Sequence, residues 1–425
     1  MTFLLLGSTL LLFAIGMPVA FAMVVSAGAA LLSLGNVPLM VLPQRIVTGA
    51  DSFPLMAIPL FLLAGNLMIG GGLTDKLSRF ATAMVGHFRG GLAQVNVVNS
   101  MVMGGMTGSA IADAVSDCKI LVPVMVKSGY SARFAAALSG ATAVIAPIIP
   151  PSIPFIIYGS IAGVSIGQLF LGGAIPGILM GVYLMVAVNV IARRRNFPRG
   201  ERPTLRGIVH ALRVSGPPLM LPVIILGGIL AGVFTPTEAG AVAVVYALVL
   251  TMVFYRSLGA ADIPKILLET GVQAGVIMLV IAAASPFSWL LAREQVGQAV
   301  VQLLAHIGDN KILFLLVLNV VLLVLGMFLD ATAILIIVVP VLVPVFDALG
   351  LDPVHMGVMV VMNLMIGMVT PPFGLVMYVV CDILKVTITD FTRELWPFLL
   401  ALVAILLTIT YVPELVLFLP KLAMR

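Results

Sequence analysis

The stretch GGMTGS at residues 104–109 interrupts an otherwise apolar part of the chain, and the stretch APIIPPSIP at residues 146–154 interrupts the next apolar part. Proline removes an amide donor and clashes with the preceding helical turn, so a run with four prolines ends a helix. Glycine at the first interruption permits backbone conformations that a helix does not use. Both stretches therefore predict helices that break inside segments of membrane length.

The same pair of interruptions occurs again 221 positions later, as GMFLD at residues 326–330 and GMVTPPFG at residues 367–374. The pair Pro150-Pro151 thereby recurs as Pro371-Pro372. Broken helices at matching positions of two halves indicate the binding site of a secondary transporter, because they expose backbone dipoles near the bilayer midplane.

The composition requires a membrane. Of 425 residues, 61% are hydrophobic and only 9% are charged, whereas about 25% are charged in an ordinary soluble domain. Apolar stretches such as 312–345 and 395–419 exceed the roughly 20 residues that cross a bilayer. Residues 1–32 are apolar without a charged n-region, so we expect a retained membrane segment that either crosses once or bends at residues 16–18. The expected class is an all-α polytopic membrane protein.

Arginines divide the chain into two halves, residues 1–192 and 217–425. The segment 193–216 between them is rich in arginine and is predicted to be a cytoplasmic basic loop by the positive-inside rule. The first half should contain a re-entrant hairpin at about 90–127 and a broken helix at about 131–163. The second half should repeat them at about 312–349 and 353–384. Four crossings between the hairpins would reverse the second copy, which gives inverted-topology repeats. The crossings are expected near 168–192, 218–234, 237–255 and 266–290.

At each hairpin tip, carbonyls of one helix end and amides of the next helix start face the same small volume, which suits a cation beside an anion. Backbone, hydroxyl and carboxylate oxygens are the ligands that hard cations such as sodium prefer. The first sodium site is predicted at Gly105, Ser109, Asp113, Ala146 and Pro147, with Thr107 beside them. The second is predicted at Gly326, Asp330, Thr332, Gly367 and Thr370.

Several of these residues have a second interpretation. Each glycine alone can equally serve close helix packing. Asp330 needs either a bound cation or a helix N-terminus to stabilise it, and Asp113 either coordinates through a hydroxyl network or caps a helix. Asn99 and Ser100 are expected to form interhelical hydrogen bonds or to contact the ion. Asp117 and Lys119 are expected to form a solvated pair at the cytoplasmic mouth.

Other cofactor chemistry has no basis in the sequence. Cys118 and Cys381 lie far apart and do not suggest a disulfide framework, and the four histidines show no metal-ligand spacing. We therefore expect sodium and no transition metal. A phosphate-binding loop of the form Gly-x-x-x-x-Gly-Lys-Ser/Thr does not occur, so the energy for transport must come from a gradient or from another subunit.

Four motifs together resemble the large membrane subunit of tripartite ATP-independent periplasmic (TRAP) transporters, over essentially the whole chain. These motifs are GMTGSAIADA at 105–114, PPSIP at 150–154, TPTEAG at 235–240 and TPPFG at 370–374. The resemblance implies an elevator-type transporter of the bacterial inner membrane that takes up an organic anion with sodium. The family handles C4-dicarboxylates, sialic acid and other sugar or keto acids.

The resemblance also implies two partners and supports part of the sodium assignment. A periplasmic solute-binding protein would deliver the anion, and a small four-helix membrane subunit would be a separate chain. The family's sodium placement supports five residues, namely Gly105, Ser109, Gly326, Gly367 and Thr370. By symmetry, we expect the substrate between the tips, near Thr107, Gly108, Pro151 and Pro372.

Three alternatives compete with this interpretation. A stand-alone ion-coupled carboxylate carrier of the same broad fold would work without a soluble partner. A passive channel needs a continuous polar lining or rings of charge, which this chain lacks. An intramembrane enzyme needs a nucleophile and a base at membrane depth, and the nearest pair, Ser109 and Asp113, has no histidine beside it. We therefore do not expect an enzyme.

Overall fold

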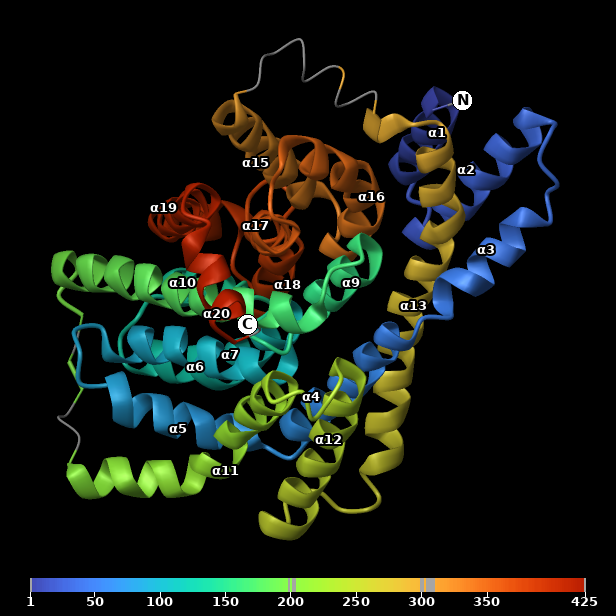
Figure 1. Ribbon diagram of the computed structural model, residues 1–425. Coiled ribbons are helices and arrows are strands. Elements are labelled where there is room, and N and C mark those ends of the chain that lie inside the picture. The colour runs from blue at the N-terminus through green and yellow to red at the C-terminus, as the bar shows by residue number, and fades with distance from the viewer. Residues whose placement is uncertain (1, 198, 201–203, 299–301, 303–309, 424–425) are drawn as a thin grey trace.

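The computed structural model describes residues 2–197, 199–200, 204–298, 302 and 310–423, and the named elements within these ranges are all helices (Figure 1). The helices of the first half are α1 (Thr2–Ala14), α2 (Val19–Leu34), α3 (Val41–Ala50), η1 (Phe53–Met56), α4 (Ala57–Gly70), α5 (Leu73–Val85), α6 (Gly91–Thr107), α7 (Ala110–Lys127), α8 (Ala132–Ala143), α9 (Ile153–Ala162) and α10 (Ile166–Arg194). Those that follow are α11 (Leu205–Leu230), α12 (Pro236–Leu248), η2 (Val249–Phe254), α13 (Ile263–Arg293), α15 (Lys311–Phe328), α16 (Ala331–Leu349), α17 (Pro353–Gly367), α18 (Leu375–Leu384), α19 (Ile388–Tyr411) and α20 (Glu414–Ala423).

Eight helical segments within the described residues are long and apolar enough to cross a membrane. Their hydropathy reflects the apolar composition, and each is only partly covered by the rest of the chain. An exposed apolar helix face is stable in lipid and unfavourable in water. This confirms the expected all-helical, multi-pass class.

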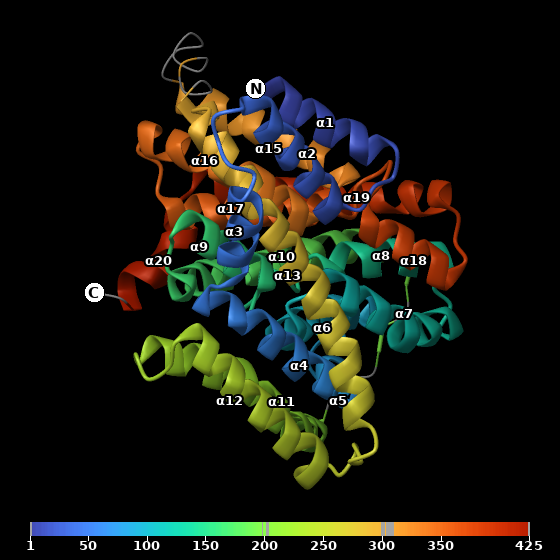
Figure 2. The same cartoon turned by 90° about the vertical axis from the view of Figure 1, so that its right-hand side faces the viewer.

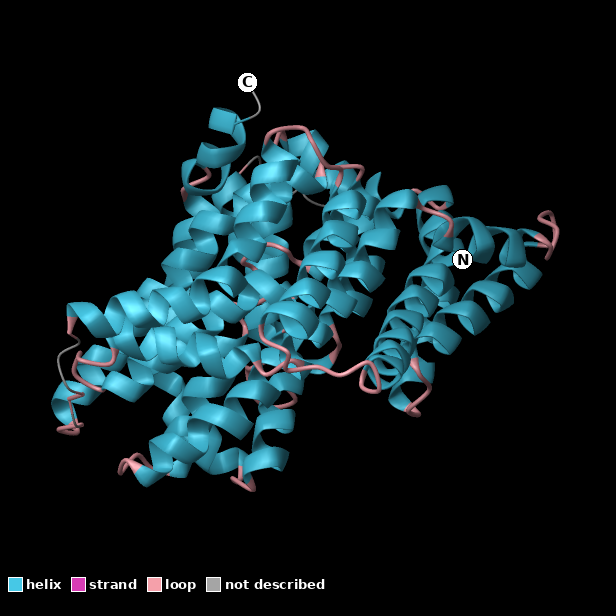
Figure 3. Ribbon diagram, turned by 90° about the horizontal axis from the view of Figure 1, so that it is seen from below, coloured by secondary structure: helices cyan, strands magenta, loops and turns pink. Residues whose placement is uncertain are grey.

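The apolar N-terminal segment bends and does not form one continuous helix. Helix α1 ends at Ala14, and α2 begins at Val19, after Gly16 in a positive-φ conformation and Pro18. Helices α2 and α3 pack on the long helix α13, and the group lies to one side of the remaining bundle in Figures 1 and 3. Of the two alternatives for residues 1–32, the bend at residues 16–18 is the one that the structure has.

Each predicted interruption lies between two helices. Residues 108–109 separate α6 from α7, and residues 144–152 separate α8 from α9. In the second half, residues 329–330 separate α15 from α16, and residues 368–374 separate α17 from α18. The peptide bonds Pro150–Pro151 and Pro371–Pro372 are both cis.

The two halves of the chain pack into each other. Helix α18 contacts α7 and α8 of the first half, and α9 contacts α16 and α17 of the second half. In Figure 2, α7, α8 and α18 lie together on the right and α9 and α16 on the left, with α10 and α17 between them. Helix α17 lies at the centre, since every one of its residues from Val354 to Gly367 is buried. Residues 144–152 of the first break are mostly buried, whereas Pro372 and Phe373 of the second break are exposed.

The basic segment 193–216 was expected to be a loop, and this is wrong for its second part. Helix α10 continues to Arg194, and α11 begins at Leu205, so residues 205–216 are helical. The reason is local: the Thr204 hydroxyl accepts from the amide of Gly207 at 3.1 Å and caps the helix. Arg202, and Asp309 near the second hairpin, lie outside the described residues.

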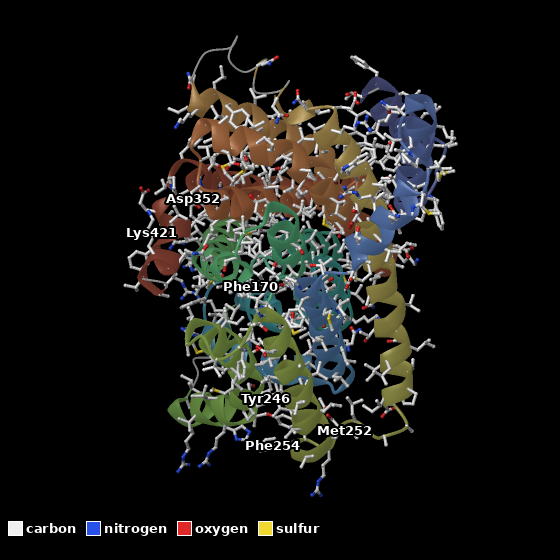
Figure 4. The ribbon with its side chains drawn as sticks, turned by 45° about the vertical axis from the view of Figure 1, so that its right-hand side comes forward. Phe170, Tyr246, Met252, Phe254, Asp352 and Lys421 are labelled. Atoms are coloured by element: carbon white, nitrogen blue, oxygen red, sulfur yellow. The ribbon has the colours of Figure 1, made fainter. Side chains whose placement is uncertain are left out.

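Side chains also join α11 to α12. The hydroxyl of Tyr246 on α12 donates to the carbonyl of Pro217 at 2.7 Å. In Figure 4, Tyr246 lies toward the lower end of the molecule with Met252 and Phe254, while Asp352 and Lys421 lie higher, on the left side.

Candidate ion and substrate site at the helix breaks

The first hairpin tip is a two-residue turn between α6 and α7. Gly108 adopts the left-handed conformation, with φ of 57°, that ends α6, and this region favours glycine. Ser109 is the N-cap of α7, since its hydroxyl accepts from the amide of Ala112 at 3.4 Å. Thr107 is buried, and its hydroxyl donates to the carbonyl of Met103. Backbone carbonyls and amides of two helix ends therefore meet at this tip.

The first tip packs directly on the first helix break. A Cβ placed on Gly104 would lie 2.9 Å from the Cα of Ala146, and one on Gly108 would lie 2.6 Å from the carbonyl oxygen of Pro151. A Cβ on Gly105 would lie 3.7 Å from the carbonyl oxygen of Pro150. Only glycine allows backbones to approach this closely. The structure thus brings Gly105, Gly108, Ala146 and Pro151 together.

Pro147 has an additional partner that the sequence did not suggest. The hydroxyl of Ser152 donates to the carbonyl of Pro147, and the hydroxyl oxygen of Ser152 accepts from the amide of Phe155 at 3.3 Å. Ser152 therefore caps α9 and also satisfies a carbonyl that the proline run leaves free. A carbonyl oxygen has two lone pairs, so one stays available for a cation. The serine directly after two prolines was the signal that could have revealed this cap.

The second hairpin tip brings two glycines into backbone contact. A Cβ on Gly326 would lie 3.1 Å from the Cα of Gly367, and a Cβ on Gly367 would lie 2.6 Å from the Cα of Gly326. Asp330 caps α16, because its carboxylate accepts from the amide of Thr332 at 2.9 Å. The helix N-terminus, which is one of the two stabilisers considered for Asp330, is present.

Thr370 lies in the second break, and both its hydroxyl and its backbone amide donate hydrogen bonds within the protein. Its hydroxyl donates to the carbonyl of Ile366 at 2.7 Å, and its amide donates to the carbonyl of Gly367 at 3.0 Å. The hydroxyl oxygen keeps its acceptor lone pairs. Gly374 closes the turn by donating to the carbonyl of Thr370 at 3.2 Å. The second predicted set thus lies on one tip and the break that packs against it, with Pro372 in the same turn.

Two fully buried carboxylates lie deeper in the first hairpin. Asp113 and Asp117 are both 0% exposed and lie four residues apart on α7, a spacing that places them on one helix face. Asp117 accepts from the side-chain amide of Asn99 at 2.7 Å and from the hydroxyl of Ser100 at 3.2 Å. The expected solvated pair of Asp117 and Lys119 is therefore wrong: Lys119 is exposed, and α6 covers Asp117.

Asp113 differs from Asp117 in its partners. Within the part of the chain that the structure describes, neither carboxylate oxygen of Asp113 has a hydrogen-bond partner. An ionised carboxylate without partners is strongly disfavoured inside a protein, so a bound cation or a proton must balance it. Asp113 begins one helical turn after the tip residue Ser109. Its carboxylate belongs to the first predicted sodium site.

Buried asparagines hold the helices around both sites. The amide of Asn96 on α6 donates to the hydroxyl of Ser139 at 2.9 Å, which links α6 to α8. The amide of Asn363 on α17 donates to the side-chain oxygen of Asn319 on α15 at 2.7 Å. Each hairpin is thereby fixed to its own broken helix. Among the described residues, no group of three or more His, Cys, Asp or Glu side chains could hold a metal ion.

These features define a class: a polytopic helical membrane protein whose two hairpin tips pack on two broken helices, with buried carboxylates on α7 of the first hairpin. Residues 6–415 match the family model of the DctM component of tripartite ATP-independent periplasmic transporters. The chain belongs to this family of TRAP transporter large permease proteins.

Three relatives illustrate the range of the family. The chain is 40% identical over 412 residues to the sialic acid TRAP transporter large permease protein SiaM of Vibrio cholerae, covering 97% of this chain and 96% of that protein. It is 40% identical over 404 residues to the 2,3-diketo-L-gulonate TRAP transporter large permease protein YiaN of Escherichia coli, covering 95% of each. It is 35% identical over 430 residues to the C4-dicarboxylate TRAP transporter large permease protein DctM of Rhodobacter capsulatus, covering 98% of each.

Proposed function

We propose that the protein is a permease subunit that drives sodium-coupled uptake of an organic anion across the bacterial inner membrane. The observation that carries this proposal is the contact of each hairpin tip with its own helix break, represented by Gly104 on Ala146 and Gly326 on Gly367. Carbonyl oxygens and helix N-termini near such contacts would supply the chemistry that an alkali cation and an anion need together.

Two sodium sites follow from this placement. The first uses Gly105, Ser109, Asp113, Ala146 and Pro147. The second uses Gly326, Asp330, Thr332, Gly367 and Thr370, where the hydroxyl oxygen of Thr370 retains acceptor capacity. The buried and unpartnered Asp113 carboxylate supports a cation at the first site.

The anion would bind between the two tips, near Thr107, Gly108, Pro151 and Pro372. Its class is that of the relatives' named solutes: sialic acid, a diketo sugar acid or a C4-dicarboxylate. Amides at the starts of α7 and α16 supply the positive dipole ends that attract carboxylates. The hairpins would be re-entrant, and the halves would form inverted-topology repeats that move as an elevator. The crossed contacts of α18 with α7 and of α9 with α16 support such a pairing.

Two partners complete the proposal: a separate small four-helix membrane subunit and a periplasmic solute-binding protein. The test is uptake into proteoliposomes that contain the chain, the small subunit and the binding protein encoded near it, with labelled sialic acid, succinate and 2,3-diketogulonate as probes. Uptake of one of these solutes that requires both an inward sodium gradient and the binding protein is expected. Equal uptake with potassium would refute sodium coupling, and uptake without the binding protein would favour the stand-alone carrier.

A further inference from the structure

An aromatic pair joins the second hairpin tip to the second helix break. Phe328 is the last residue of α15, and Phe373 lies in the turn between α17 and α18. Their ring centroids are 5.2 Å apart. The two residues are nevertheless 57% and 52% exposed, and Pro372 beside them is exposed as well. The described part of the chain therefore leaves a surface of two phenyl rings uncovered where the tip meets the break.

The internal repeat shows that the hairpin architecture does not require these rings. The positions 221 residues earlier are Thr107, which ends α6 as Phe328 ends α15, and Ser152, which lies in the first break. Both are buried, and each hydroxyl donates to a carbonyl of its own segment. The first tip thus packs on its break with two small polar side chains. The aromatic pair must serve something other than this packing.

The first tip is covered by neighbouring helices, which leaves the second tip as the more open one. A Cβ placed on Gly65 of α4 would lie 3.2 Å from the carbonyl oxygen of Met106. A Cβ on Gly105 would lie 2.8 Å from the ring of Pro222 on α11. In this conformation, a solute can reach the second tip more readily than the first.

The place of the pair within its segment indicates water and not lipid around it. Residues 368–374 lie near the middle of the segment 353–384, which is long enough to cross a bilayer. Non-helical backbone at membrane depth is tolerated only where protein buries it or where it lines a water-filled cavity. Pro372 and Phe373 are exposed, which indicates such a cavity. Aromatic rings are unfavourable in water, so a ligand that covers them would gain affinity.

We propose that Phe328 and Phe373 form the apolar wall of the solute site and select a cyclic sugar acid of the sialic acid type. This inference rests on the proposed function, because it assumes that an organic anion binds between the tips. Ligand sites combine a few polar groups with apolar and aromatic walls. Amides at the helix starts would hold the carboxylate, and the rings would pack on C–H groups of the sugar ring. Succinate has little apolar surface between its two carboxylates, so the wall contributes less to its binding.

The pair would also couple the solute to sodium. Phe328 follows the proposed ligand Gly326 by two residues, and Phe373 follows the proposed ligand Thr370 by three. A solute that contacts both rings would hold the second tip on the second break, which is the arrangement that the second sodium site needs. Each ligand would then raise the affinity of the protein for the other, since such coupling is reciprocal.

Cysteine modification tests whether the pair faces water and solute. The full chain with its small subunit is placed in nanodiscs as Phe328→Cys or Phe373→Cys and treated with a charged thiol reagent, which reacts in water and not in hydrocarbon. Wild type is the control, since Cys118 and Cys381 are buried. Both variants should react, and sialic acid with sodium should slow the reaction severalfold more than succinate does. Absence of reaction, or reaction that sialic acid does not slow, overturns the proposal.

Transport by the complete system with its binding protein is the second test. Sodium-driven uptake of labelled sialic acid should fall by at least about tenfold in Phe328→Ala and in Phe373→Ala. Phe373→Tyr keeps the ring and should transport like wild type. Phe418→Ala is the matched control, because Phe418 is 59% exposed on α20, away from both tips. Binding of ²²Na⁺ without solute should be unchanged in every variant, which shows that the variants fold.

Failure of this inference is distinct from failure of the proposed function. If wild type shows no sodium-driven uptake of any probe solute, the proposed function itself is wrong. If wild type transports and both alanine variants match Phe418→Ala, only the aromatic wall is wrong. Wild-type uptake of succinate alone, or an equal loss of succinate uptake in the alanine variants, overturns the selection of sugar acids. Release of the small subunit from these variants during purification would assign the rings to a protein interface and overturn the proposal.

Discussion

Replacing Gly367 by alanine tests the second sodium site most directly. The new Cβ would lie 2.6 Å from the Cα of Gly326 and 2.8 Å from its carbonyl carbon. Carbon atoms in contact prefer about 3.5–4.0 Å. The second tip must therefore move away from the second break by about 1 Å. Neither partner can relieve the contact with a side-chain rotation, because both are glycines.

The cost of Gly367→Ala has two parts. Overpacking of this kind typically destabilises a protein by about 1–3 kcal/mol. When the second tip shifts by about 1 Å, one carbonyl oxygen is moved out of contact with the bound sodium ion, since hard cations accept oxygen distances within only a few tenths of an ångström. The loss of one such contact should resemble the loss of a hydrogen bond to a charged group, about 1.5–3 kcal/mol. Sodium affinity should therefore fall by at least about tenfold.

The assay is binding of ²²Na⁺ to the purified full chain, together with the sodium-dependent rise in melting temperature. Gly326→Ala is a milder version, because its Cβ would lie 3.1 Å from the Cα of Gly367. Gly275→Ala on α13 is the control, since no neighbouring atom lies within 4 Å of its Cβ. The expected order of sodium affinity is wild type and Gly275→Ala, then Gly326→Ala, then Gly367→Ala. Sodium binding by folded Gly367→Ala that equals the control would refute the site assignment.

Three further predictions concern single side chains. Asp330→Ala removes the cap on the amide of Thr332 and should lower the free energy of unfolding by about 1 kcal/mol. The rise in melting temperature that sodium causes should also become smaller. An unchanged rise would exclude Asp330 from the second sodium site. Asp117→Ala leaves the amide of Asn99 without its buried acceptor and should destabilise the chain by about 1–3 kcal/mol, to be measured by thermal unfolding in detergent. A loss below about 1 kcal/mol would contradict the buried network. Tyr246→Phe removes a 2.7 Å hydrogen bond to a carbonyl of α11 and should cost about 1 kcal/mol without changing sodium binding; a change in sodium binding would show that α12 acts on the site.

Local chemistry explains what the sequence predicted well. Prolines and glycines act on their own helix, so the breaks after Ala143 and after Gly367 could be located without any tertiary information. The apolar composition likewise fixed the class of protein. Within the TPTEAG motif, Thr235 and Glu238 form a capping box, which depends only on short-range spacing, and the structure contains both of its hydrogen bonds.

Tertiary contacts explain what the sequence could not predict. Asp117 looked solvated beside Lys119, but its burial depends on Asn99 and Ser100 of another helix. The spacing of Asp113 and Asp117 did indicate a shared helix face, and reading that face together with the two polar residues on α6 would have corrected the interpretation. Ser152 was missed because its partner is the carbonyl of Pro147, which becomes free only when the helix breaks.

The two tips differ in their electrostatics, and this difference bears on the order of ion binding. At the second tip, Asp330 is partly exposed and already stabilised by the amide of Thr332. In the first hairpin, Asp113 is fully buried with two oxygens unpartnered in the described structure. A cation gains more from the second kind of carboxylate, because the surrounding medium screens it less. If both sites hold sodium, the first site should fill at the lower sodium concentration. Asp113→Asn should therefore remove the high-affinity phase of ²²Na⁺ binding. The low-affinity phase, which Gly367→Ala removes, should remain. Loss of both phases in Asp113→Asn would mean that the two sites are not independent.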